Sequence, residues 1–416
     1  VYGDDDGGPA DRGAVYVLDL AGTSVVTVNS TGDGTDAIPG DGVCTTGGTN
    51  ADGDPECTLR AAITEANASA TVDTIDFAIP ATDPGYEAGA PGFWSIQGAS
   101  DLPDVLAPVT IDGTTQPGWL ANTIVAPGPF DSTLTIELSD DSGMEAMTLA
   151  AAADGSTLRG LVFEGVRLYN DADSVTIAGN YLGTEPDGLT ASSTVGDMIS
   201  HSGTDLQLGG TAPADRNVIA TDFPAFIAGS ATIEGNSFGL GVDGVTPVKS
   251  PYGVLVLQAN GVLLGGTTPA AANIITGGDT EEGVQVDSGV EATILGNHIF
   301  GNVGLGIDID GDGVTANDAG DGDAGTNDLL NFPVIDRATE TAGTVTVDLT
   351  LDVPAGDYRI EAFTNPSGAD PTGYGEGQVF AAGTTVTHTG SGPENFSLTY
   401  AGSVGDVVSL TTTEDL

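Results

Sequence analysis

The apolar positions between about residue 105 and residue 335 form short runs of β-branched and aliphatic side chains, none longer than about six residues. Gly, Asn and Asp separate these runs from one another. Short apolar runs bounded by turn-forming residues are typical of β-strands. The pattern therefore predicts an all-β protein built from many short strands.

Two phrases recur at fixed spacing within this stretch. Asn180, Asn236 and Asn297 occupy equivalent places in the first phrase, at offsets of 56 and 61 residues, and the second phrase recurs at the same offset of 56. Short strands repeated at a fixed period predict a parallel β-solenoid. The copies are VTIAGNYLG (175–183), ATIEGNSFG (231–239) and ATILGNHIF (292–300) for the first phrase, and LGGTAPADRNVIA (208–220) and LGGTTPAAANIIT (264–276) for the second.

The three Asn residues follow Gly at equivalent corners of the repeat. Stacked amide side chains can satisfy backbone groups at corners of this kind, so Asn180, Asn236 and Asn297 are predicted to form a structural ladder. The alternative is that a row of amides binds sugars.

One segment has a helical pattern. In TLRAAITEANA (58–68), Leu59, Ala62, Ile63 and Ala66 fall on one face of a helix. A helix of this length suits a cap over the open end of an apolar core.

The chain has two cysteines, Cys44 and Cys57, thirteen residues apart in a loop rich in Gly and Asp. No His or further Cys lies near them, so a zinc site is excluded and a disulfide is predicted, with two free thiols as the alternative. A disulfide implies an oxidising location, so we expect a secreted protein, extracellular or at the cell surface.

The segment GDGVC…ECTLRAAITEANA resembles the N-terminal CSLREA-type domain found ahead of right-handed parallel β-helices in bacterial and archaeal surface proteins. IDGTTQPGW (111–119) resembles the phrase that begins the β-helix in the same family. The resemblance covers about residues 24–416. It implies a disulfide-bearing cap at 24–104, a right-handed parallel β-helix (a solenoid) at 105–335 and an antiparallel β-sandwich at 336–416.

The predicted C-terminal sandwich rests on strand-like pieces separated by turn residues. Relatives in the family usually continue into one more short strand, whereas this sequence stops at TTTEDL, so we expect the sandwich to lack a strand. The pieces are TVTVDLTLDV, DYRIEAFTN, GQVFAAGTTVTHT, NFSLTYAGS and DVVSLTTT.

Residues 1–23 form an arm with one apolar strand and no partner strand of its own. The arm resembles the end of an integrin-type β-propeller repeat. The strand is expected either to be such a remnant or to pair with another subunit. Its residues are Ala14, Val15, Tyr16, Val17, Leu18, Asp19 and Leu20.

The charge balance excludes several classes of partner. Sixty acidic residues against eight basic ones give a net charge of −52, and Lys249 is the only lysine. Such a surface repels nucleic acid, anionic membranes and polyuronates. No window approaches 18 consecutive apolar residues, so no membrane insertion is expected.

The acidic loop near the end of the repeat is a candidate calcium site, because Ca²⁺ prefers six to eight oxygen ligands. It is no EF-hand, since position 319 is Ala rather than Glu. The alternative is a solvated loop. The candidate ligands are Asp308, Asp310, Asp312, Asp318, Asp321 and Asp323, with Asp4 and Asp6 of the arm as a weaker second group.

No catalytic constellation is apparent. The eight basic residues are scattered, and carboxylate pairs such as Asp140 and Asp141 are expected by chance among sixty acids. We therefore expect no enzymatic activity.

The sequence predicts a structural subunit that assembles head-to-tail into a filament, sheath or surface layer, by strand exchange with calcium-stabilised joints. The alternatives are a monomeric carbohydrate-binding adhesin and a β-helix enzyme that degrades glycans.

Overall fold

The structure is a computed structural model of the 416-residue chain. It describes residues 24–68, 73–89, 91–192, 198–248, 254–278, 282–287 and 289–414. The arm with its strand Ala14–Leu20, and with Asp4 and Asp6, lies outside the described residues.

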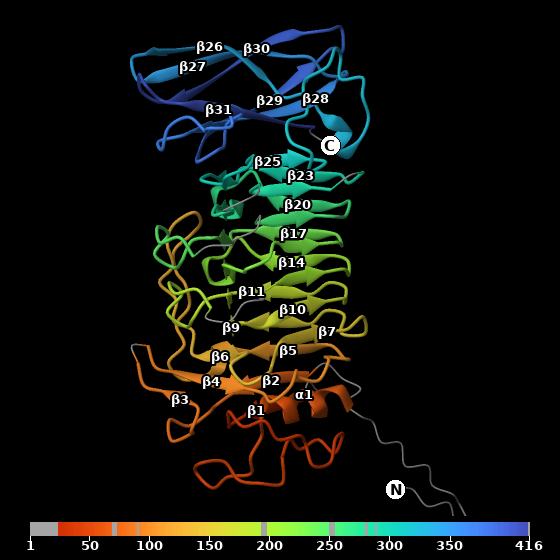
Figure 1. Cartoon of the computed structure of the whole chain (residues 1–416), viewed down its shortest axis with the longest axis vertical. Helices are drawn as coiled ribbons and strands as arrows, with labels where there is room; N and C mark the ends of the chain where they lie inside the picture. The colour runs from red at the N-terminus through yellow and green to blue at the C-terminus, as the bar shows by residue number, and fades with distance from the viewer. Residues whose placement is uncertain are drawn as a thin grey trace, which may run out of the picture.

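Three sheets of parallel strands make up most of the molecule (Figure 1). Sheet A contains β1 (Val25–Val28), β2 (Asp73–Phe77), β5 (Val109–Asp112), β8 (Thr157–Arg159), β11 (Thr176–Ala178), β14 (Leu206–Gly209), β17 (Ala231–Glu234), β20 (Val262–Gly265) and β23 (Ala292–Leu295). Sheet B contains β3 (Tyr86–Glu87), which is antiparallel to its neighbour, β4 (Phe93–Gln97), β6 (Ile136–Ser139), β9 (Leu161–Glu164), β12 (Tyr181–Leu182), β15 (Val218–Ile219), β18 (Ser237–Phe238), β21 (Ile274–Ile275) and β24 (His298–Ile299). Sheet C contains β7 (Ala146–Leu149), β10 (Arg167–Asn170), β13 (Ile199–His201), β16 (Ala225–Ile227), β19 (Leu255–Leu257), β22 (Val284–Val286) and β25 (Ile307–Ile309).

The chain visits the three sheets in one repeating order. From β5 to β25 it passes from sheet A to sheet B to sheet C, seven times over, and successive strands of a sheet pair in parallel. The passes lie one above the other along the long axis of the molecule (Figure 1). The 56-residue offset of the sequence repeat therefore spans two passes, from β12 to β18.

The core consists of side chains that stack from pass to pass. In sheet A, Ile177 pairs with Leu208, Leu208 with Ile233, and Ile233 with Leu264, and all four are fully buried. Since side chains alternate along a strand, the residues between them point outward. These short strands thus bury one continuous apolar column.

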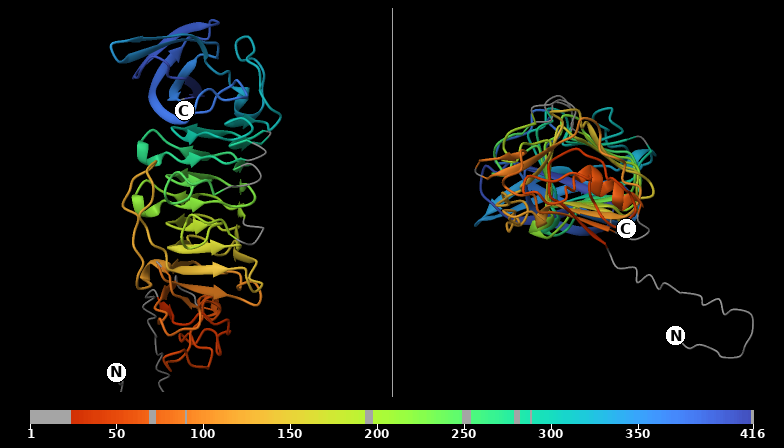
Figure 2. Two further views of the ribbon diagram at one scale, coloured as in Figure 1. Left: turned by 60° about the vertical axis from the view of Figure 1, so that its left-hand side comes forward. Right: turned by 90° about the horizontal axis from the view of Figure 1, so that it is seen from below.

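Helix α1 (Leu59–Ala68) covers the N-terminal end of this column (Figure 2, right). The predicted stripe of Leu59, Ala62, Ile63 and Ala66 is buried and belongs to the same core as β1 and β2. The predicted disulfide between Cys44 and Cys57 is present in the loop before the helix.

Two antiparallel sheets follow the last pass. One contains β26 (Val334–Thr341), β27 (Thr344–Leu351) and β30 (Glu394–Ala401), and the other β29 (Val379–His388), β28 (Gly356–Thr364) and β31 (Val408–Glu414). Val347 and Leu398 of the first sheet share a core with Tyr358 and Ile360 of the second. The expectation of a predominantly β protein, with parallel strands followed by antiparallel sheets, is confirmed.

The second antiparallel sheet covers the C-terminal end of the parallel column. The buried Glu361 of β28 accepts a hydrogen bond from the backbone N–H of Gly296 at 2.7 Å. Ile299 and Gly377 exchange backbone hydrogen bonds. Both ends of the apolar column are therefore covered within one chain.

A long segment between β5 and β6 lies along the outer face of sheet B, where Trp119 and Phe130 pack against Val162, Tyr181 and Val218.

Single turns of 3-10 helix occur in the connections. They are η1 (Gly113–Thr115), η2 (Pro213–Asp215), η3 (Pro269–Ala271) and η4 (Thr326–Leu329).

Candidate functional site

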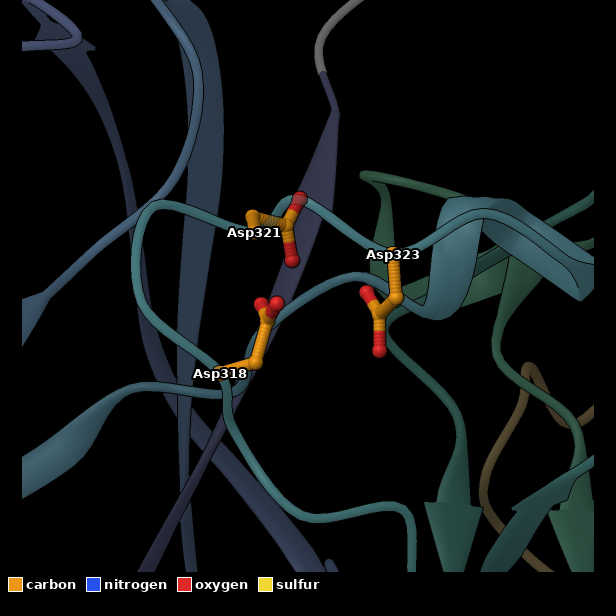
Figure 3. Close-up of side chains that lie close together, drawn as sticks. All are labelled: Asp318, Asp321 and Asp323. Carbon is orange, nitrogen blue, oxygen red and sulfur yellow. The ribbon is translucent and has the colours of Figure 1, made fainter.

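The structure divides the six aspartates of the acidic loop into two groups. Asp318, Asp321 and Asp323 each bring a carboxylate oxygen within 4.8 Å of the others (Figure 3). Asp308, Asp310 and Asp312 do not belong to this group. We call Asp318, Asp321 and Asp323 the acidic triad. The triad could hold a divalent cation, because carboxylate oxygens are the ligands that Ca²⁺ prefers.

Asn331 holds the triad loop in place. Its side-chain oxygen accepts from the Asp318 N–H at 3.0 Å, and its amide nitrogen donates to the Asp318 carbonyl at 2.9 Å. The backbone N–H of Asn331 donates to Asp321 Oδ1 at 2.7 Å. These bonds fix two of the three carboxylate-bearing residues relative to each other.

The electrostatics of the triad favour a bound cation. Asp321 is buried, which raises the pKa of its carboxyl, and the charges of Asp323, Asp318 and Asp328 raise it further. Within the described ranges, no ion pair joins Arg or Lys to a triad residue. A divalent cation would offset the repulsion between the three carboxylates.

Asp352 connects the triad loop to the C-terminal sheets. It follows β27, and its Oδ2 accepts from the Gly320 N–H at 3.0 Å, while its carbonyl accepts from Asn331 at 2.6 Å. Asp352 Oδ1 is buried and has no hydrogen-bond partner in the described part of the chain. The sequence analysis missed Asp352, because it stands in a strand-like phrase and nothing local links it to residue 320.

The Asn ladder has more members than the sequence analysis assigned. Asn217 lies between Asn180 and Asn236, and Asn273 lies between Asn236 and Asn297. The side-chain oxygen of each member after Asn180 accepts from the backbone N–H of the preceding member, at 2.8, 3.2, 2.9 and 3.1 Å along the row, and that of Asn180 accepts from the Leu161 N–H at 3.0 Å. All five side chains are buried. This arrangement leaves the amides occupied with each other and with the backbone, rather than available to a ligand.

A buried glutamate cluster on sheet B was also missed. Glu137 on β6 is 5% exposed, and burial raises its pKa to about 7, with the charges of Glu185 and Glu164 adding to the effect. Glu164 accepts hydrogen bonds from the hydroxyls of Ser139 and Ser192 at 2.8 and 2.9 Å. The signal in the sequence was weak, since single glutamates occur in many strands.

Sheet C carries a shallow groove on its outer face. Its floor includes Phe226 and Val256, and the Asp287 carboxylate accepts from the amides of Gln258 and Gln285 at 2.7 and 2.8 Å. An aromatic ring beside amides and a carboxylate is compatible with binding a neutral sugar.

The C-terminal sheets are open along one side. β29 and β30 contact each other on one side, so the edge strands β26 and β31 lie on the other, which we call the open side; β31 also contacts β23, where the Thr413 hydroxyl donates to the Ile294 carbonyl, whereas β26 is exposed. Ile335 and Ala338 of β26 pair with the buried Leu349 and Val347, and therefore face the core, yet both are exposed. Both edge strands pair on one side only among the described strands.

A search of models of known protein families finds no match to this chain, and a search of curated proteins finds none either. Within the described residues, none of the helices combines the length and the apolar character needed to span a bilayer. The disulfide is compatible with an extracellular location.

Proposed function

We propose that the protein is an extracellular structural subunit that assembles head-to-tail, with the arm strand Ala14–Leu20 of one copy completing the open side of the next. The observation that carries the proposal is the exposure of core-facing residues on β26. An edge strand offers unpaired backbone groups, and an added strand would pair with them and bury Ile335 and Ala338.

The sequence of the arm strand suits this role. Ala14, Tyr16, Leu18 and Leu20 alternate with other residues, so a strand conformation would place them on one face. Donation from one copy to the next is a heterologous contact, which does not close on itself and therefore produces an open fibre.

We take the repeating A-to-B-to-C order of the parallel strands to be one right-handed parallel β-helix, with a CSLREA-like cap at residues 24–104 and a C-terminal β-sandwich. The stacked passes and the covered ends support this assignment. A rigid rod with an acceptor at one end and a donor arm at the other is suited to a filament, sheath or surface layer.

Calcium is proposed to stabilise the joint between the parallel strands and the C-terminal sheets. The acidic triad belongs to the loop that joins them, and Asp352 anchors that loop to β27. A Ca²⁺ ion at the triad would hold the acceptor sheets in a fixed orientation. The proposal assigns no catalytic reaction to the protein.

Two complementary variants test strand donation. Deletion of residues 1–22 removes the donor, and Ala338→Glu places a charge on the core-facing side of β26. Each variant alone is expected to stay monomeric, whereas an equimolar mixture should form one-to-one dimers that grow no further, as measured by light scattering after size-exclusion chromatography.

The matched control is Thr339→Glu, the next residue along β26, which points away from the core and should leave polymerisation intact. Polymers formed by the deletion variant, or equal inhibition by Ala338→Glu and Thr339→Glu, would refute donation into the open side.

A further inference from the structure

Asp308 occupies an unusual place for a carboxylate. It lies on β25, in register with Gln285 of β22, at an outward-facing position of sheet C. It is nevertheless 1% exposed, because the chain folds back over this position. The loop after β25 lies close against Gln285, since a Cβ added at Gly311, whose φ is 65°, would lie 2.6 Å from the Gln285 amide nitrogen.

Only one of the two Asp308 carboxylate oxygens has a hydrogen-bond partner among the described residues. Its Oδ2 accepts from the Gly313 N–H at 3.0 Å, whereas Oδ1 is buried and has no partner among the described residues. Burial raises the pKa of Asp308 and the charges of Glu282 and Asp312 add to the effect, while the backbone N–H groups of Gly313 and Gly311 lower it in part. None of the ion pairs in the described ranges supplies it with a cation. A buried anionic oxygen without a donor is costly, and a bound metal ion would remove that cost.

The surrounding loop has a suitable spacing of carboxylates along the sequence, although Asp308, Asp310 and Asp312 do not gather their oxygens as the acidic triad does. Asp308, Asp310 and Asp312 alternate along the chain, and Gly313 follows as the sixth residue with a φ of 97°. The EF-hand loop uses carboxylates at its first, third and fifth positions and a glycine at the sixth for the sharp turn, and the present loop shares this first half of the pattern without the glutamate at the twelfth position. The Asp310 carboxylate accepts from the Thr326 hydroxyl of η4, which ties the loop to the segment beyond the acidic triad.

We infer that the loop Asp308–Gly313 is a second calcium site, separate from the acidic triad and centred on the unpartnered oxygen of Asp308. The ion would fix β25, the last strand of sheet C, against the loop that follows it. This site does not depend on assembly, so it can be present whether or not the subunit polymerises.

Equilibrium dialysis of the full chain against ⁴⁵Ca²⁺ in about 1 M NaCl, which screens diffuse binding to the acidic surface, tests the inference. Asp318→Asn with Asp323→Asn removes the triad, and this double variant should keep a bound Ca²⁺. Adding Asp308→Asn should abolish that binding, and adding Asp312→Asn should weaken it at least tenfold.

Asp312 is exposed, so its substitution should leave the fold intact even where the change at buried Asp308 does not. Asp104→Asn, at another exposed position, is the control and should change nothing. Absence of binding in the double variant, or binding that is insensitive to both Asp308→Asn and Asp312→Asn, would overturn the second site. If the double variant binds as many Ca²⁺ ions as the wild type, the triad holds none, and that result would count against the joint proposed above while leaving the second site in place.

Discussion

Glu137 makes the stability of the fold depend on pH. Burial holds its folded-state pKa near 7, whereas the unfolded side chain has a value near 4.5. Below about pH 4.5 both states are protonated, and this group then has no effect on stability. Between 4.5 and 7 the folded state retains a proton that the unfolded state has lost, so stability falls as pH rises.

The substitution Glu137→Gln should remove this dependence. The wild type is expected to lose about 3 kcal/mol of unfolding free energy from this group between pH 4.5 and 7, and the variant should not. Urea denaturation at several pH values measures the difference. Glu87→Gln, at an exposed position, serves as the control. Parallel pH profiles for wild type and Glu137→Gln would show that Glu137 is not the group responsible.

At the residue scale, the members of the Asn ladder could be recognised from the sequence, whereas the buried surroundings of Asp352 and Glu137 could not. All five Asn residues precede a pair of strand residues that begins a strand of sheet B, as in Asn217-Val-Ile and Asn273-Ile-Ile, so the shared pattern was available within the second repeat phrase. The roles of Asp352 and Glu137 were not available. Their burial depends on residues far away in the chain, such as Gly320 for Asp352.

The strands of sheet B are short, two residues each from β12 to β24, and the Asn ladder holds the turns that precede them. Asn273 accepts from the Asn236 N–H at 2.9 Å, and its amide nitrogen donates to the Ile233 carbonyl at 2.8 Å and to Asn297 at 2.9 Å. One side chain thus connects three successive passes of the chain.

We predict that Asn273→Ala destabilises the protein by roughly 3–5 kcal/mol, because it leaves the buried N–H of Asn236 and the carbonyl of Ile233 without their partner and removes the contact with the Asn297 side chain. The exposed Asn395→Ala is the matched change and should cost less than about 1 kcal/mol. Chemical denaturation measures both. A loss below 1 kcal/mol for Asn273→Ala would mean that water replaces the amide and that the ladder contributes little.

Elements with a strong local pattern were predictable, and β26 was not. The stripe of α1 and the alternating apolar residues of β27 are visible in the sequence, and both are buried as expected. β26 has no such alternation and is almost entirely exposed. A strand that pairs at an edge without burying a face leaves little hydrophobic signal, so its existence follows only from its partner β27.

At the scale of the whole molecule, both ends of the parallel column are covered and the open side of the C-terminal sheets is not. The helix α1 covers one end and the sheet containing β28 covers the other, which protects the column from uncontrolled stacking. A net charge of −52 also opposes non-specific association. Under this account, copies associate only where the open side accepts a strand.

Electron microscopy of the purified full chain, in millimolar Ca²⁺ and again with EGTA, tests the central claim most directly. The account predicts filaments in Ca²⁺ that shorten or dissolve on chelation, because the joints that orient the acceptor sheets lose their ions. If the filaments are unaffected by EGTA, the protein assembles as proposed but calcium does not stabilise its joints. Single rods in both conditions would contradict the account and favour the monomeric adhesin.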